Sequence, residues 1–208
     1  MGIGEVALHR AVFLDRDGVL NRTYLHRDGK THPPASPEET EILPGVPDAC
    51  QALRRAGYLL IGVTNQPDVA RGTQQIEVVK AINEKLLRHL PLHEIRVCYH
   101  DNQDNCACRK PKPGLILAAK DFWGIDLAES FVVGDRWTDI EAGQRAGCKT
   151  IFIGPAPLPD SDRGKPNFQT DSLMEAAIWI IKGQHSGVKV RQKPYTINAA
   201  QFLKGEKS

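Results

Sequence analysis

The sequence has no hydrophobic run close to the roughly 18 residues that a membrane-spanning helix needs. Its first residues also lack the combination of a basic segment, a long apolar segment and a small-residue cleavage site that marks a secretory signal. No internal repeat is present. We therefore expect a soluble, cytoplasmic protein that has no membrane partner, and its 208 residues are enough to bury a core without disulfide bonds.

A strong excess of charge of one sign is also missing, because the net charge is only +2. This balance argues against a nucleic-acid partner. With 41% hydrophobic and 25% charged residues the composition is close to the globular average, which argues against disorder, collagen and coiled coil. Basic residues do collect at one end, where residues 182–208 hold six of them against one acid. We predict one domain over residues 1–182 and a solvated basic tail over residues 183–208.

The five cysteines are an odd number, which argues against a disulfide framework. Three of them and one histidine crowd into eleven residues. These four are Cys98, His100, Cys106 and Cys108. Three thiolates and one imidazole complete a tetrahedral Zn²⁺ site and leave no position for water, so we predict a structural zinc. The other two cysteines, Cys50 and Cys148, are expected to pack in the core.

Apolar runs rich in β-branched residues predict buried strands. They cover residues 11–14, 59–63, 131–133 and 150–153, with a weaker candidate at 95–99. Segments with helical periodicity lie between and after them, at residues 46–56, 75–90, 115–123, 140–146 and 172–181. This alternation predicts an α/β fold with a Rossmann-like, doubly wound and mainly parallel sheet flanked by helices. Residues 21–41 and 155–170 are expected to be surface loops, the first forming part of a substrate wall.

Acidic residues follow two of the predicted strands. Asp15 and Asp17 come directly after the first strand, and Asp135 and Asp139 follow the strand at 131–133. The carboxyl ends of strands face the ligand crevice of an open α/β sheet, so these acids are expected to converge. Two converging acidic pairs repel each other unless a cation lies between them, and hard oxygen ligands favour Mg²⁺.

Hydroxyl, amide and cationic groups accompany these acids. Thr64 and Asn65 end the second strand, and the segment Arg109-Lys110-Pro111-Lys112-Pro113-Gly114 precedes a predicted helix. Carboxylates, a hard metal, a hydroxyl donor and a lysine together indicate phosphoryl transfer, in which a carboxylate can act as the nucleophile.

The series Asp-x-Asp-Gly, Thr-Asn, Lys-Pro and Gly-Asp-x-x-x-Asp, in this order, resembles the haloacid dehalogenase (HAD) superfamily of phosphatases. The resemblance spans about residues 10–154. A Cys-Arg-Lys-Pro segment preceded by a Cys/His cluster resembles the capless, zinc-containing branch of that superfamily. This branch includes heptose bisphosphate and histidinol-phosphate phosphatases. It implies no large cap domain and a loop that is pinned by zinc.

The resemblance implies a role for each matching residue. Asp15 would attack phosphorus, and Asp17 would protonate the leaving oxygen and then activate water. Thr64 would bind the phosphoryl oxygens, Asn65 would help to hold the substrate, and Lys110 would neutralise the phosphoryl group.

The metal site is implied in the same way. The side chains of Asp15 and Asp135 and the backbone carbonyl of Asp17 would hold Mg²⁺, and Asp139 would support them.

Three further cations flank these motifs. Arg109 is implied to recognise substrate, and Arg136 stands where the heptose branch usually has lysine, so a second phosphate can still be met there. Lys112 is the alternative to Lys110. We favour Lys110 because it follows Cys-Arg directly, as in the resembling branch. The neighbouring prolines fix the local chain, so we expect one of the two lysines to reach the crevice.

The substrate is left open between two members of the branch. Residues 66–72, which contain Ala-Arg-Gly, resemble the heptose enzymes, whereas the gap between His100 and Cys106 resembles histidinol-phosphate phosphatases. We favour D-glycero-D-manno-heptose 1,7-bisphosphate, cut at the 7-position by a monomer. His26, His32 and Trp137 are candidate substrate contacts.

Two other classes of function remain as alternatives. A non-catalytic phospho-receiver also places acids at strand ends, but it has no need of Asp17 as a base. A nucleic-acid end phosphatase would use the basic tail, and its activity would fall steeply with salt.

Overall fold

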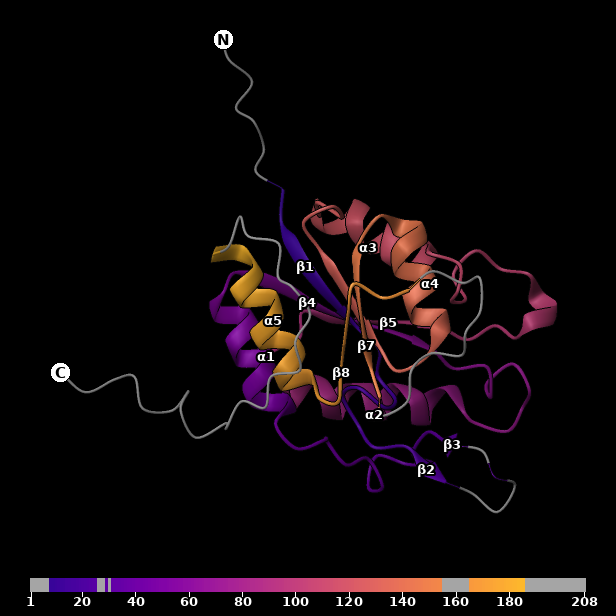
Figure 1. The fold of residues 1–208 in the computed structure, drawn as a ribbon. Coiled ribbons are helices and arrows are strands. Elements are labelled where there is room, and N and C mark those ends of the chain that lie inside the picture. The colour runs from indigo at the N-terminus through magenta and orange to yellow at the C-terminus, as the bar shows by residue number, and fades with distance from the viewer. Residues whose placement is uncertain (1–7, 26–28, 30, 155–164, 186–208) are drawn as a thin grey trace, which may run out of the picture.

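The computed structural model describes residues 8–25, 29, 31–154 and 165–185. Six parallel strands form one sheet in the order β5-β4-β1-β6-β7-β8 (Figure 1). They are β1 (Arg10–Leu14), β4 (Tyr58–Asn65), β5 (Glu94–Cys98), β6 (Phe131–Gly134), β7 (Lys149–Ile153) and β8 (Phe168–Thr170). The chain runs outward from β1 through β4 to β5 and then returns to the other side of β1 for β6, which makes the sheet doubly wound.

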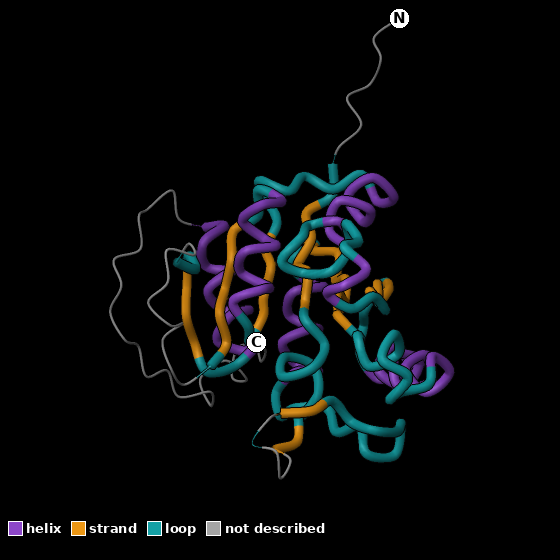
Figure 2. The backbone as a smooth tube through the Cα atoms, turned by 90° about the vertical axis from the view of Figure 1, so that its right-hand side faces the viewer, coloured by secondary structure: helices purple, strands orange, loops and turns teal. Residues whose placement is uncertain are grey.

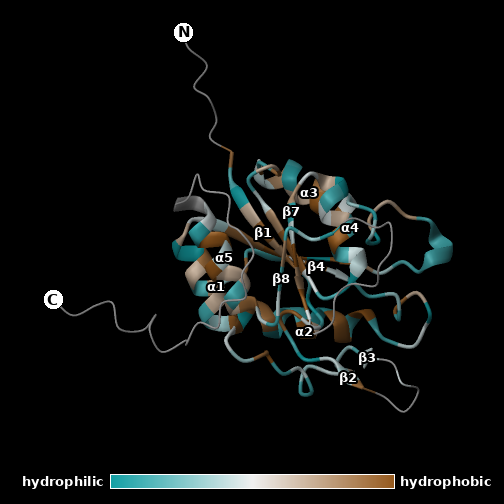
Figure 3. Cartoon of the chain, viewed as in Figure 1, coloured by the Kyte–Doolittle hydropathy of each residue, from teal (hydrophilic) through white to brown (hydrophobic). Residues whose placement is uncertain are grey.

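Helices cover both faces of the sheet, as predicted. One face carries α1 (Val46–Arg55), α2 (Ile76–His89) and α5 (Leu173–His185), and the other carries α3 (Gly114–Trp123) and α4 (Trp137–Ala146). Because side chains alternate along a strand, Val12 and Leu14 of β1 enter the first core while Ala11 and Phe13 enter the second. Figure 3 shows the hydrophobic residues gathered in the central strands. Cys50 and Cys148 are buried, which confirms their predicted place in the core.

The helix predicted at residues 140–146 begins three residues earlier, at Trp137. The carboxylate of Asp139 accepts a hydrogen bond from the backbone N–H of Arg136, at 3.0 Å, and so satisfies a free donor of the first turn. This cap fixes Asp139 at the helix start, beside the end of β6.

Two predicted loops contain short strands. Residues 21–41 include an antiparallel hairpin of β2 (Tyr24–Leu25) and β3 (Thr31–His32), which lies at the carboxyl end of the large sheet (Figures 1 and 2). The segment predicted as a loop at 155–170 ends in β8, which pairs with β7; residues 155–164 lie outside the described residues. A single 3₁₀ turn, Asn102–Asp104, follows β5.

No helix in the described part of the chain is long and apolar enough to cross a membrane. The same residues contain no large cap domain, because the segment between β4 and β5 holds one helix, α2. Helix α5 runs to His185, three residues beyond the predicted domain boundary, and the rest of the predicted tail lies outside the described residues.

Candidate active site

The acidic residues meet where the strand order of the sheet reverses. Asp15 and Asp17 follow β1, Asp135 follows β6, and these two strands are neighbours. Ligands of open α/β sheets bind at such a switch point, outside the carboxyl ends of the strands. Gly18 turns the first loop with φ +94°, and a Cβ on it would lie 2.1 Å from Asp135 Oδ2. A glycine at this position therefore allows the two strand ends to approach closely.

Lys110 lies at the centre of these carboxylates. Its Nζ is 2.5 Å from Asp15 Oδ1, 2.6 Å from Asp139 Oδ1 and 2.6 Å from the carbonyl oxygen of Val63, and the residue is 4% exposed. The ammonium of Lys112 instead donates to Asn105 and to the carbonyl of Cys106. Of the two candidate lysines, Lys110 is thus the one that the structure brings to Asp15.

The charge of this site is not balanced. Asp15, Asp135 and Asp139 each offer an oxygen within 4.8 Å of the others, and Lys110 is the cation buried among them. Burial raises the pKa of Asp15 to about 6, although the Lys110 charge opposes this shift. Burial, with the charges of Asp15 and Asp139, raises the pKa of Asp135 to about 8. Burial alone would lower the pKa of Lys110, but the carboxylates of Asp139 and Asp15 raise it. The site therefore has an excess of negative charge that a cation would relieve.

The donor set fits Mg²⁺. Asp135 Oδ1 is buried and has no hydrogen-bond partner among the described residues, which is costly unless a ligand occupies it. Carboxylate oxygens are the ligands that Mg²⁺ prefers. Asp15 and Asp135 would hold the ion. Both oxygens of Asp139 are already engaged, one by Lys110 and the other by the backbone N–H of Arg136, which suits a supporting position.

A cleft opens over these groups at the carboxyl end of the sheet. Its lining consists of Asp15, Asp17, Thr31, His32, Pro33, Thr64, Asn65, Gln66, Pro67, Asp68, Arg71, Lys110, Arg136, Thr138 and Asp139. It brings together most of the residues singled out from the sequence, including His32 from the β2–β3 hairpin. Asp135 and Trp137 are not part of the lining, and His26 lies outside the described residues.

Two predicted substrate contacts have other partners in the structure. Arg109 does not line the cleft; its guanidinium donates to Asn102 Oδ1 at 2.8 Å and to the carbonyl of His100 at 3.3 Å. Asn65 does line the cleft, but its side-chain amide both accepts from the backbone N–H of Lys110 and donates to the Lys110 carbonyl, each at 3.1 Å. Asn65 therefore orients the segment that carries Lys110.

Three residues of the site were given no individual role from the sequence. Arg16 is completely buried and donates two hydrogen bonds to Asp17, and Gln66 donates another. Arg71 lines the cleft and makes two bonds of 2.8 Å to the carboxylate of Asp101, in the loop that follows β5. Arg16 lies within the Asp-x-Asp motif, Gln66 follows Thr-Asn, and Arg71 belongs to the Ala-Arg-Gly segment, which were the available signals for them.

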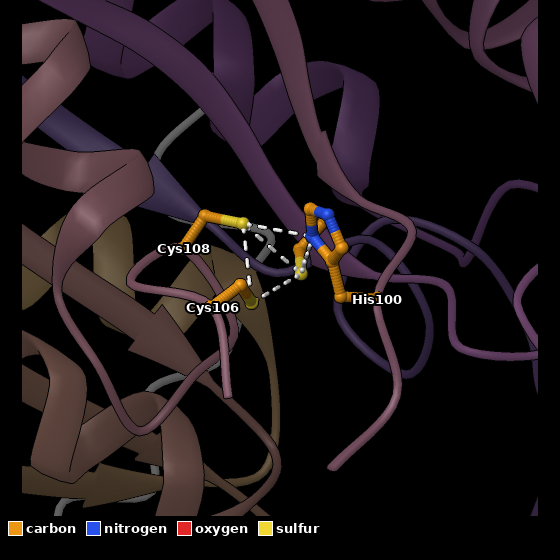
Figure 4. A group of neighbouring side chains, drawn as sticks. His100, Cys106 and Cys108 are labelled. Atoms are coloured by element: carbon orange, nitrogen blue, oxygen red, sulfur yellow. Dashed lines mark hydrogen bonds between the residues drawn. The ribbon is translucent and has the colours of Figure 1, made fainter. Parts of the chain in front are cut away.

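The four predicted zinc ligands converge in the loop over residues 98–108, here called the zinc loop (Figure 4). Cys108 Sγ lies 3.3 Å from His100 Nδ1, 3.5 Å from Cys106 Sγ and 3.3 Å from Cys98 Sγ. Cys98 Sγ lies 3.6 Å from His100 Nδ1 and 3.7 Å from Cys106 Sγ. Tetrahedral Zn²⁺ bond lengths give edges of about 3.5 to 3.8 Å, so this donor set fits zinc.

Comparison with known proteins gives concordant results. The HAD-hydrolase-like family model matches residues 107–176. The chain is 35% identical over 188 residues to the D-glycero-beta-D-manno-heptose-1,7-bisphosphate 7-phosphatase of Vibrio cholerae, covering 83% of this chain and 96% of that protein. It is 33% identical to the Escherichia coli K12 protein of the same name, covering 88% and 96%.

A solved structure is similar as well. The D,D-heptose 1,7-bisphosphate phosphatase of B. bronchiseptica, complexed with magnesium and phosphate, superposes with a TM-score of 0.72 at 29% identity and covers 84% of this chain and 99% of its own. The order of the motifs, the doubly wound sheet and these relatives agree, and the chain belongs to the HAD-like hydrolase family.

Proposed function

We propose that this protein is a magnesium-dependent phosphomonoester hydrolase that works through an aspartyl-phosphate. The observation that carries the proposal is the placement of Asp15 against Lys110, within one cleft that also contains Asp17 and Thr64. This set supplies a nucleophile, a counter-charge, a proton carrier and a hydroxyl donor at a single point.

The first half-reaction forms the covalent intermediate. A carboxylate oxygen of Asp15 attacks phosphorus while the bond from phosphorus to the leaving oxygen breaks, and Asp17 gives that oxygen its proton. Lys110 and Thr64 would neutralise and orient the phosphoryl oxygens, because both face Asp15 or the cleft around it. Magnesium, when held by Asp15 and Asp135, would reduce the repulsion between these carboxylates and the phosphate.

The second half-reaction regenerates the enzyme. Asp17 takes a proton from a water molecule, whose oxygen bonds to phosphorus as the bond to Asp15 breaks. The products are inorganic phosphate and free Asp15. The need for Asp17 in both steps is what separates this proposal from a phospho-receiver, which retains its phosphoryl group.

The proposed substrate is heptose 1,7-bisphosphate, cut at the 7-position. Its support is the similarity to proteins of that name and the cation Arg136, which lines the cleft; Arg71 also lines it, with its charge paired to Asp101 and Asp68. A second phosphate on the substrate would meet positive charge there, whereas histidinol phosphate carries no second phosphate. The catalytic groups all come from one chain, so we propose that the monomer is active.

A substrate panel tests this proposal. Heptose 1,7-bisphosphate, histidinol phosphate and short phosphorylated oligonucleotides are assayed with magnesium, and the position of cleavage is followed by NMR. We expect the bisphosphate to have the highest kcat/KM, with phosphate released from carbon 7 and no activity in Asp15→Asn. A preference for histidinol phosphate would reject the substrate, and an active Asp15→Asn would reject the mechanism.

A further inference from the structure

Gln66 connects two groups of the cleft through one nitrogen atom. Its Nε2 lies 2.7 Å from Asp17 Oδ2 and 2.8 Å from Thr64 Oγ1. A primary amide carries two hydrogens and can donate to both oxygens at once. We infer that Gln66 is a positioning residue that holds the proton donor Asp17 in register with the hydroxyl of Thr64. The inference rests on the proposed function, which assigns those two roles.

The glutamine is itself held firmly. It is 3% exposed, and its backbone N–H donates to the carbonyl of Cys98, the last residue of β5, at 2.7 Å. Since Cys98 is also the first ligand of the zinc loop, the main chain of Gln66 is fixed between two strand ends. A buried amide with a fixed backbone has few alternative orientations.

Asp17 also receives hydrogen bonds from two residues that do not line the cleft. Arg16 donates to Oδ1 from Nε at 3.1 Å and to Oδ2 from Nη2 at 2.9 Å, and Asn21 donates to Oδ1 at 3.0 Å. Arg16 and Asn21 are fully buried and do not line the cleft, whereas Gln66 does. Of these three residues, Gln66 is therefore the one that fixes the carboxylate from the cleft side.

The hydrogen bond from Gln66 to Thr64 connects Asp17 to the residue that would bind the phosphoryl oxygens. Because the Thr64 hydroxyl accepts from Gln66, its own hydrogen is left to be donated to a phosphoryl oxygen. The leaving oxygen that Asp17 must protonate is bonded to that same phosphorus. The Gln66 amide, which is shared by Asp17 and Thr64, therefore fixes the position of Asp17 relative to the phosphoryl group. A misplacement of about 1 Å between reacting groups can lower the rate by about 100-fold.

A purely structural role for Gln66 predicts a different result. If the side chain only fills buried volume, its replacement slows every substrate to the same degree. If Gln66 instead places Asp17, the loss of rate depends on the leaving group, because nitrophenolate departs without receiving a proton whereas an alkoxide must receive one.

The experiment compares kcat/KM for an alkyl phosphate and for p-nitrophenyl phosphate in Gln66→Met, which keeps the size and removes the donor. We expect a loss of about 30-fold for the alkyl substrate and of about threefold or less for the aryl one. Asp17→Asn should show the same selectivity more strongly, and Thr64→Val should slow both substrates together. Gln51→Met, at an exposed position of α1, is the matched control and should change neither.

Gln66→Asn is the second variant, since it keeps an amide at the buried position if the methionine prevents folding. Its side chain is one methylene shorter, which withdraws the donor from Asp17 and Thr64, so the alkyl-to-aryl ratio should fall in the same direction. Equal losses for the two substrates in whichever variant folds, or no loss, would overturn the inference while leaving the proposed function intact. Failure of the wild-type protein to hydrolyse any phosphomonoester of the substrate panel would instead refute the proposed function.

Discussion

Replacing Lys110 with methionine removes an ammonium that is buried among the carboxylates of Asp15, Asp135 and Asp139. Its Nζ contacts Asp15 and Asp139 at 2.5 and 2.6 Å, and its side chain is 3% exposed. Breaking a buried ion pair by deleting one partner typically costs about 3 to 5 kcal/mol. For a protein of this size, that loss corresponds to a fall in Tm of about 10 °C.

The loss of stability in Lys110→Met should depend on pH. The pKa of Asp15 is already raised to about 6, so at low pH the folded state binds a proton on this residue more tightly than the unfolded state does. The contribution of this proton to the free energy of unfolding is lost as pH rises through that value. Without the Lys110 charge, this pKa rises further. The difference in Tm between wild type and variant, measured in magnesium-free buffer, should therefore be larger at alkaline than at acidic pH.

The same variant should lose activity by about 100-fold or more, because a charge that stabilises the transferring phosphoryl group is absent. The assay is phosphate release at saturating magnesium. Lys112→Met is the matched control. The ammonium of Lys112 binds Asn105 and the carbonyl of Cys106, both in the zinc loop, rather than the carboxylates, so kcat of this variant should stay within a few-fold of wild type. An active Lys110→Met, or equal losses in the two variants, would refute this account of the site.

Further predictions concern the two metals. Gly18→Ala would place a Cβ 2.1 Å from Asp135 Oδ2, so we expect magnesium affinity, measured from activity against magnesium concentration, to fall about tenfold or more. Gly124→Ala is the control, because Gly124 also has a positive φ but lies in open space, and it should lower only Tm. Equal magnesium affinities in the two variants would contradict this prediction. The pKa values of Asp15 and Asp135 are raised to about 6 and about 8, so the metal-free protein should lose stability as pH rises through this interval. Calorimetry should then detect the release of protons when magnesium binds. Binding without proton release would show that these carboxyls are already ionised. Elemental analysis should find one zinc per chain. Removing the zinc with a chelator and then restoring magnesium should lower kcat/KM, because the zinc loop would no longer hold Lys110 in place. A zinc-free protein of full activity would refute this link between the zinc loop and Lys110.

Most of the fold follows from local sequence patterns. Among the described residues, the β-branched runs and the helical periodicity between them predict five of the parallel strands and the five α-helices to within a few residues, because each element buries one or both faces against the sheet. Strands of two or three residues, such as β2, β3 and β8, are too short to show periodicity. Their existence depends on a partner elsewhere in the chain, as β8 depends on β7.

The candidate site was likewise predictable from the sequence only in part. Asp15 and Asp135 could be predicted to converge because residues at strand ends share one edge of a parallel sheet, whereas Lys110 was predicted from the resemblance to the HAD superfamily. The pairing of Arg71 with Asp101 could not, since it depends on how two irregular loops meet. A charged residue within a polar motif likewise gives no sign that it will be buried completely, as Arg16 is.

The most direct test of the central claim is to detect the phosphoryl group on Asp15. Asp17→Asn should slow hydrolysis of the intermediate, so this variant is mixed with p-nitrophenyl phosphate and magnesium, quenched in acid, and examined by peptide mass spectrometry after borohydride reduction. We predict a burst of nitrophenolate close to one equivalent per chain and conversion of residue 15 to homoserine. A burst with the label on another residue, or turnover that leaves residue 15 unmodified, would contradict the mechanism.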